Sequence, residues 1–275
     1  MQKIPSLALA VLLAGCAHQR LSGADLDRVS HPAFISRIEE GAGPKSRVFT
    51  EDNAYQGRLN RLQPVEADRR LRLKLANGIG RFEVSDRLRA DTLAHLPKER
   101  PWTRAVDPAA VAGVLESFLI EEVPANPPDY ELLSPLGADA VVEFVIQDYG
   151  MRSANGHAGA YVSGLGRLFF LRGPEVWRST FVMDQIQLHE PALDPFEVAK
   201  RPELFRDAMS KLLDQAAAQF ARELSPPERS LEGTRHEARP AEDLPKKITD
   251  TERTPAEKPK PDDSLEPEKP PGEPR

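Results

Sequence analysis

The chain has 275 residues, with 37 basic and 43 acidic side chains, a net charge of -6 and an isoelectric point near 5.6. This acidic balance argues against nucleic acid as the main partner, because nucleic acid requires a basic face. The chain has one cysteine, which excludes an intramolecular disulfide and a metal site built from several thiolates.

The most specific motif lies at the amino terminus. Lys3 precedes a mostly apolar stretch over residues 4–13, which has the length of a secretory signal and is too short to cross a hydrocarbon core of about 30 Å as a helix. The stretch ends in Leu13-Ala14-Gly15-Cys16, where a branched residue and two small residues precede the cysteine. This segment resembles the lipobox of bacterial lipoproteins. The resemblance implies that residues 1–15 are a cleaved signal peptide and that lipid is attached to Cys16.

This resemblance predicts a membrane-anchored protein of the cell envelope. More than one acyl chain, palmitate among them, is expected on such a cysteine, and two chains anchor stably where one is marginal. Ala17 follows Cys16, whereas an Asp there retains lipoproteins at the inner membrane in enteric bacteria, so the periplasmic face of the outer membrane is favoured. Two alternatives are an ordinary signal peptide that contains a cysteine, and a buried amino-terminal strand.

The composition also divides the rest of the chain. Residues 226–275 hold 11 of the 26 prolines and no Phe, Tyr or Trp, which predicts a disordered tail, either a spacer or a partner-binding arm. Residues 16–46 contain several Gly and Pro residues and are predicted to be an irregular, lipidated linker. The globular domain is therefore expected over residues 47–225.

Helical signals begin at Pro64. The spacing of Ala67, Leu71 and Leu75 predicts a helix over residues 65–76, closed by Asn77-Gly78 as a left-handed cap. Its basic side chains look like a solvated face. Residues 81–85 alternate as a short strand, residues 87–96 predict a helix, and Asp107-Pro108 is a typical helix start.

The second half alternates between apolar and polar residues. Strands are predicted over residues 138–149, 160–172 and 175–187, with a glycine-containing loop over 153–159 and a tight turn at Gly173-Pro174. Their close spacing predicts an antiparallel meander. Gly164 and Gly166 lie inside the second strand, where glycine permits close packing or a bulge. A long helix follows over residues 202–224. The sum is an α+β fold, a small, largely antiparallel or mixed sheet packed by three to four helices.

The order of these elements resembles a known group of envelope proteins. Gly137-Ala138-Asp139 followed by a strand is similar to a signature of the curli-secretion-type lipoproteins. The amino-terminal domain of TolB and the lipoprotein activators of peptidoglycan synthases are similar in fold. The resemblance covers residues 64–224. The usual first strand of that fold is not clear, and residues 47–50 are a weak candidate for it.

No motif in the sequence predicts catalysis. There is no Gly-x-Ser-x-Gly elbow, phosphate-binding loop or His-Glu-x-x-His pair, so no catalytic residue, cofactor-binding residue or metal ligand is predicted. The adjacent Glu121 and Glu122 would point in different directions, so they make a poor acid–base pair. Asp148 and Tyr149 lie at the end of a predicted strand, where functional sites are common, but the sequence names no partner for them. The six histidines are scattered: His18, His31, His95, His157, His189 and His236. We expect a non-enzymatic module that binds an envelope protein; the alternative is an envelope hydrolase or ligand-binding lipoprotein.

Overall fold

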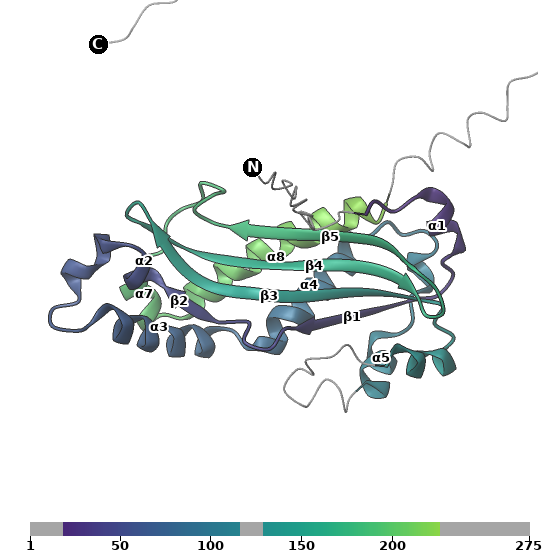
Figure 1. Ribbon diagram of the computed structural model, residues 1–275, viewed down its shortest axis with the longest axis horizontal. Coiled ribbons are helices and arrows are strands. Elements are labelled where there is room, and N and C mark those ends of the chain that lie inside the picture. Colours follow the sequence, from purple (N-terminus) through teal and green to yellow (C-terminus); the bar gives the residue numbers. More distant parts are fainter. Residues whose placement is uncertain (1–18, 116–128, 226–275) are drawn as a thin grey trace, which may run out of the picture. The chain divides into compact units, whose positions relative to one another are not determined.

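The structure is a computed structural model that describes residues 19–115 and 129–225 (Figure 1). These residues form a five-stranded mixed sheet with helices packed against it, so the predicted α+β class is confirmed. The strands are β1 (Pro32–Ile38), β2 (Lys45–Arg47), β3 (Ala140–Ala154), β4 (His157–Phe170) and β5 (Glu175–Asp184). The helices are α1 (Gly23–Arg28), α2 (Val48–Glu51), α3 (Pro64–Gly78), α4 (Arg81–His95), α5 (Pro108–Val114), α7 (Pro195–Lys200) and α8 (Glu203–Glu223), with 3-10 helices η1 (Asn53–Arg58), η2 (Trp102–Arg104) and η3 (Tyr130–Leu136).

The sheet combines a parallel and an antiparallel part. The strands β3, β4 and β5 form the antiparallel meander that the sequence predicts. Two short strands run parallel to β3 and follow one another along the same edge of it, β1 along residues 140–146 and β2 along residues 150–152. The strand order is therefore β1–β3–β4–β5, with β2 extending the β1 edge.

One face of the sheet carries the main core. The helices α4 and α8 lie against this face (Figure 1), and Phe220 of α8 stacks on Phe144 of β3 with ring centroids 5.2 Å apart. Trp177 of β5 meets Phe220 edge-on at 5.6 Å. The residues that the helical period places on the inner side of α8 are all buried: Phe205, Met209, Leu212, Leu213, Ala216 and Phe220.

Two glycines of β4 create the space for this aromatic core. A Cβ atom on Gly164 would lie 2.2 Å from the carbonyl oxygen of Val145, and one on Gly166 would lie 2.6 Å from the Trp177 ring. The close packing predicted for these two glycines is confirmed.

The boundary between α3 and α4 differs from the prediction. The strand expected over residues 81–85 is wrong, because α4 begins at Arg81. Val84, Leu88 and Thr92 are buried at a spacing of four, which is the spacing of one helix face. Residues 81–85 alternate like a strand when read alone, but they belong to this longer helical pattern. The left-handed cap at Gly78 is also wrong. Gly78 ends α3, and a Cβ atom there would lie 2.6 Å from the carbonyl oxygen of Pro202.

The hairpin between β3 and β4 is tighter than predicted. In place of a loop over residues 153–159, β3 continues to Ala154 and β4 begins at His157. Asn155 and Gly156 connect them, with φ angles of 52° and 79°. Asn-Gly favours this two-residue turn because both positions need a positive φ.

The amino-terminal segment is folded from Gln19 onward. The irregular linker expected before residue 47 is wrong for its described part, because that part contains α1 and β1. The weak first-strand candidate over residues 47–50 is wrong as well, since Arg47 ends β2 and α2 begins at Val48. Phe34 and Ile38 of β1 are buried in the core, so burial outweighs the turn-forming residues on either side.

Candidate functional site

We call the sheet face opposite α4 and α8 the open face. The polar and charged side chains of the strands that reach the surface lie mainly on this face. Its two ends differ. One end is covered by α5 and η3, which bury Ile35 and Val141 in a small second cluster. Beyond that end lie the open-face side chains of β2 to β5: Lys45, Arg47, Asp148, Tyr161, Ser163, Leu165, Thr180 and Val182.

A bulge in β3 places Asp148 on the open face. The register of β3 against β4 shifts between Ile146 and Asp148, with Gln147 as the extra residue. Before the bulge the even-numbered residues face the core, and after it the odd-numbered residues do, so Tyr149 is buried and Asp148 is not. Asp148 and Tyr149 were predicted to end a strand, but they lie in the middle of β3.

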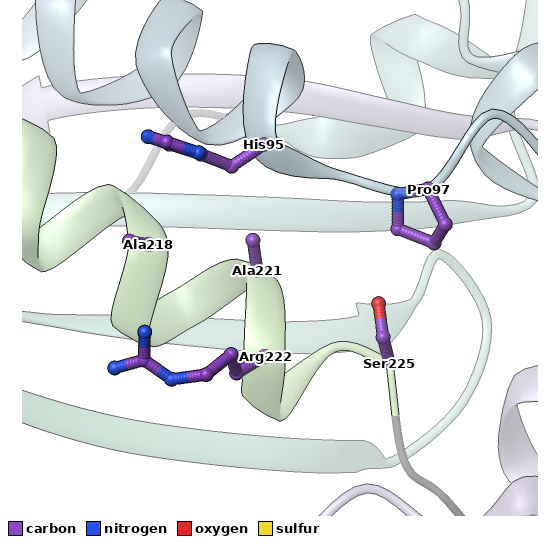
Figure 2. Close-up of a pocket in the computed structure, with 6 residues that line it drawn as sticks. All are labelled: His95, Pro97, Ala218, Ala221, Arg222 and Ser225. Atoms are coloured by element: carbon purple, nitrogen blue, oxygen red, sulfur yellow. The ribbon is translucent and has the colours of Figure 1, made fainter.

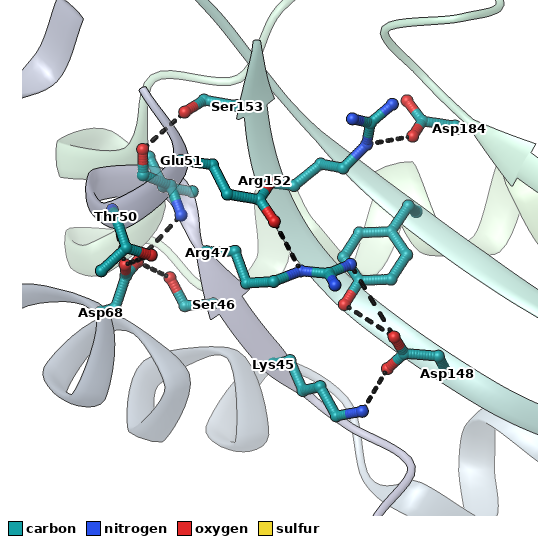
Figure 3. Close-up of polar contacts among 12 residues, drawn as sticks. Lys45, Ser46, Arg47, Thr50, Glu51, Asp68, Asp148, Arg152, Ser153 and Asp184 are labelled. Atoms are coloured by element: carbon teal, nitrogen blue, oxygen red, sulfur yellow. Dashed lines mark hydrogen bonds and ion pairs between the residues drawn. The ribbon is translucent and has the colours of Figure 1, made fainter. Parts of the chain in front are cut away.

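Asp148 is the centre of a cluster of charges (Figure 3). The Nζ atom of Lys45 lies 3.0 Å from its carboxylate, Nη2 of Arg47 lies 3.8 Å from it, and the Tyr161 hydroxyl donates a hydrogen bond to it at 3.4 Å. Burial raises the pKa of Tyr161 and the charge of Asp148 raises it further, so this hydroxyl stays a donor at neutral pH. The cluster thus holds two partly exposed cations, Lys45 and Arg47, next to a buried phenol.

Contacts around Arg47 hold this side chain in place. Its guanidinium lies 4.8 Å from the centre of the Tyr161 ring and 3.3 Å from the carboxylate of Glu51. Arg152, which is opposite Arg47 in the register of β2 and β3, pairs with Asp184 at the end of β5 (Figure 3). Stacking on an aromatic ring and pairing with a carboxylate both limit the rotamers of an arginine, which reduces the entropy lost when it binds a partner.

A second polar cluster lies nearer the covered end. Glu143 of β3 has no exposed side-chain surface, and it accepts hydrogen bonds from Arg37, Arg167 and the Tyr130 hydroxyl. Burial raises the pKa of Glu143, but the hydrogen bond from Arg167 and the charge of Arg37 outweigh it and hold the pKa below its ordinary value. Burial and the charge of Glu143 raise the pKa of Tyr130. This cluster is too enclosed to contact a partner directly.

Between the two clusters the open face is uncharged. Val182 is 64% exposed, Thr180 is exposed, and Ser163 and Leu165 are half-buried. An uncharged, partly exposed strip on neighbouring strands with Arg47 beside it fits two features of protein interfaces, which carry few charges at their centre and are enriched in arginine. The geometry of the open face suits binding of a protein surface.

A cavity of about 500 Å³ lies on the other side of the molecule, between α4 and α8 (Figure 2). Three of its lining residues have side chains of the types that act in catalysis, namely His95, Arg222 and Ser225. The His95 ring points away from Ser225 in Figure 2, and its Nε2 atom lies 2.7 Å from Asp214. The remaining lining consists of alanine and proline. The histidine and the serine are therefore not arranged as a nucleophile and its base.

A smaller and more apolar groove of about 250 Å³ lies where α2, η1 and α7 meet α3. Phe49, Leu71 and Phe196 line it, together with the cations Arg70 and Lys74. Arg70 also pairs with Glu66, whose pKa falls to about 2 because Arg69 and Arg70 donate hydrogen bonds to it. The basic residues of α3 are exposed, as the sequence predicts.

The other residues singled out in the sequence do not converge. Cys16, the predicted lipid attachment site, lies outside the described residues, as do Glu121 and Glu122. Within the described ranges, no three His, Cys, Asp or Glu side chains gather in a way that could hold a metal ion. Asp148 acquires partners that sequence reasoning did not find, because they come from β2 and β4.

No helix of residues 19–115 and 129–225 has the length and apolar character of a membrane span.

Comparison with known proteins gives only distant likenesses. No protein-family model and no curated protein matches the sequence. Among solved structures, a PelC dodecamer from Paraburkholderia phytofirmans is 11% identical, with a TM-score of 0.31 over 76% of this chain and 94% of that one. The lipoprotein GNA1162 from Neisseria meningitidis is 14% identical, with a TM-score of 0.30 over 56% of this chain and 82% of that one. The hypothetical protein CT253 from Chlamydia trachomatis is 14% identical, with a TM-score of 0.29 over 71% and 98% of the two chains.

Proposed function

We propose that this chain is a bacterial envelope lipoprotein, anchored through Cys16, whose α+β domain binds another envelope protein through the open face and catalyses no reaction. The observation that carries the binding role is the uncharged strip around Val182, which lies beside the ordered cations of the Asp148 cluster. The anchor is supported by Leu13-Ala14-Gly15-Cys16 at the end of an apolar stretch of signal-peptide length. By the identity of Ala17, the periplasmic face of the outer membrane is the preferred location.

The anchor is tested by replacing Cys16. Cells that express the natural chain or the Cys16→Ser variant are fed labelled palmitate, and the mass of the amino-terminal peptide is measured. We expect label and a diacylglyceryl mass on the natural chain, and neither on the variant. Label that persists in Cys16→Ser would overturn the anchor, and an unlabelled natural chain would do the same.

The binding surface is tested by photo-crosslinking in cells. A photoreactive amino acid is placed at Val182 on the open face or at Val65 on α3, which is 72% exposed and serves as the matched control. We expect a discrete crosslinked species from position 182 and none from position 65. Crosslinks from position 65 alone would place the binding surface on α3 and not on the open face. The absence of crosslinks from both positions would contradict a protein-binding role.

The apolar groove beside α3 favours a second function, the binding of a small amphiphile with an apolar chain and an anionic group. Its apolar wall and the cations Arg70 and Lys74 fit those two parts. A fluorescent fatty acid should bind saturably to the natural chain and not to Ala199→Trp, which fills the groove. Ala192→Trp, outside the groove, is the control. If Ala199→Trp and Ala192→Trp bound the fatty acid equally well, the groove would not be its binding site and this second function would be refuted.

A further inference from the structure

The folded domain begins very close to the predicted anchor. The backbone of Gln19 pairs with that of Arg178 on β5, with N–H to carbonyl distances of 2.9 and 3.0 Å. The Gln19 side chain also donates to the carbonyl oxygen of Glu175 at 3.2 Å. Only three peptide steps separate Gln19 from Cys16. Because a fully extended residue spans about 3.3–3.6 Å, Cys16 lies within about 11 Å of Gln19.

The segment that follows Gln19 is packed against the rest of the domain. Leu21 and Leu26 are buried, and the Ser22 hydroxyl accepts a hydrogen bond from the backbone N–H of Asp25 to cap α1. From Gln19 onward the segment is therefore held against the sheet. An acylated Cys16 would bring the outer edge of β5 to the bilayer surface, where a thirty-residue linker would have left the domain free to turn.

Arginine side chains surround this point of attachment. Arg20 is exposed next to Gln19, and Arg172 is exposed in the turn between β4 and β5. The Arg28 guanidinium lies over the Phe170 ring at 4.4 Å, and Arg178 pairs with Glu175. The carboxylates beside them are engaged: Asp25 contacts Arg28 and Ser22, Glu175 contacts two arginines, and Asp27 has its own interaction.

We infer that this anchor-proximal surface, made of Arg20, Arg28, Arg172 and Arg178, rests on the headgroups of the bilayer that holds the acyl chains of Cys16. The inference depends on the proposed lipidation. Given that anchor, two features support the orientation: the short tether between Cys16 and Gln19, and the arginines, which favour anionic headgroups. In this orientation the sheet stands with its β5 edge on the membrane. The open face then looks sideways, along the membrane, where another envelope protein can reach it.

The test measures the distance of two positions from the membrane. Because Cys16 is the only cysteine and is blocked once acylated, a cysteine introduced by Arg172→Cys or by Arg72→Cys can be labelled alone with a fluorophore. Each variant removes one exposed arginine, and Arg72 lies on α3, away from β5. The full-length lipidated proteins are reconstituted into vesicles of phosphatidylethanolamine and phosphatidylglycerol that contain a headgroup nitroxide quencher. We expect quenching to be several-fold stronger at position 172 than at position 72.

A second arm lengthens the tether. About twenty Gly and Ser residues, which span about 25 Å on average, are inserted after His18, and quenching at position 172 should then fall toward that at position 72. The mass of the amino-terminal peptide is measured on every preparation. Peptide without lipid would refute the proposed anchor and this orientation with it. Lipidated protein with equal quenching at both positions, or with quenching that the insertion does not change, would overturn the orientation alone.

Discussion

The carboxylate of Asp68 on α3 accepts the backbone N–H of Val48, twenty residues earlier, at 2.9 Å, and so caps α2 from another helix. It also accepts the N–H groups of Phe49 and Thr50 at 3.3 and 3.0 Å, and the hydroxyls of Ser46 and Thr50. The side chain is only 6% exposed. A single buried carboxylate therefore joins β2, α2 and α3, directly beneath the strand that supplies Lys45 and Arg47 to the open face (Figure 3).

Replacing Asp68 should destabilise the domain. Asp68→Ala removes the cap and leaves buried N–H groups without an acceptor, so we expect the free energy of unfolding to fall by about 2 kcal/mol. Urea denaturation followed by circular dichroism measures this. Asp86→Ala, which removes a carboxylate that is 62% exposed on α4, should change the stability by less than about 1 kcal/mol. Equal losses in both variants would show that the Asp68 cap contributes nothing beyond a surface ion pair.

Replacing Glu143 should also destabilise the domain. Glu143→Gln removes the charge that two largely buried arginines share, and breaking a buried ion pair by removing one partner costs about 3 kcal/mol. The matched control is Glu131→Gln, which changes an exposed glutamate in η3. The measurement is the midpoint of urea unfolding. A Glu143→Gln protein as stable as the control would mean that the arginines find other partners at no cost.

Acid should reduce the contribution of Glu143. Its pKa is lowered in the folded state, so the charged form stabilises the fold above the ordinary pKa of glutamate, about 4.3, and the stabilisation is lost as the pH falls through the lower, folded value. The stability difference between the natural chain and Glu143→Gln should therefore narrow below about pH 4. Urea titrations at several pH values would show this. A difference that widens on acidification would reverse the assigned direction of the pKa shift.

The elements with a long regular period could be predicted from the sequence. The buried positions of α8 recur over the whole helix, and the meander of β3 to β5 alternates over strands of at least ten residues. β1 could not be found in this way. It has seven residues and is buried on both faces over Ala33 to Ile35, so apolar and polar residues do not alternate along it. It also begins with Pro32, and the Gly and Pro residues on either side of it indicate turns.

The candidate site was harder to predict than the fold. Asp148 reaches the open face only because the bulge at Gln147 changes which side chains face the core, and alternation read from sequence assumes no bulge. Its partners on β2 are about one hundred residues earlier in the chain. Asp68 and Val48 are likewise brought together by tertiary packing. Apart from a Gly or an unusual polar residue within a strand, the sequence carries no local signal for such contacts.

Adding one methyl group to β4 should disturb the aromatic core. On Gly166 the new Cβ would lie 2.6 Å from the buried Trp177 ring and 3.1 Å from the Phe220 ring. Both rings are fully buried, so neither can move aside freely. We expect Gly166→Ala to lower the free energy of unfolding by about 2 kcal/mol and to change the near-ultraviolet circular dichroism of Trp177.

The control for Gly166→Ala is a glycine with space around it. Gly113 is exposed in α5, and a Cβ atom there meets nothing within 4 Å. Gly113→Ala should raise the free energy of unfolding by about 0.5–1 kcal/mol, because alanine loses less backbone entropy in a helix. The two substitutions are chemically identical and should act in opposite directions. A gain of stability in Gly166→Ala as well would mean that backbone entropy, and not the contact between β4 and the Trp177 ring, decides the effect at Gly166.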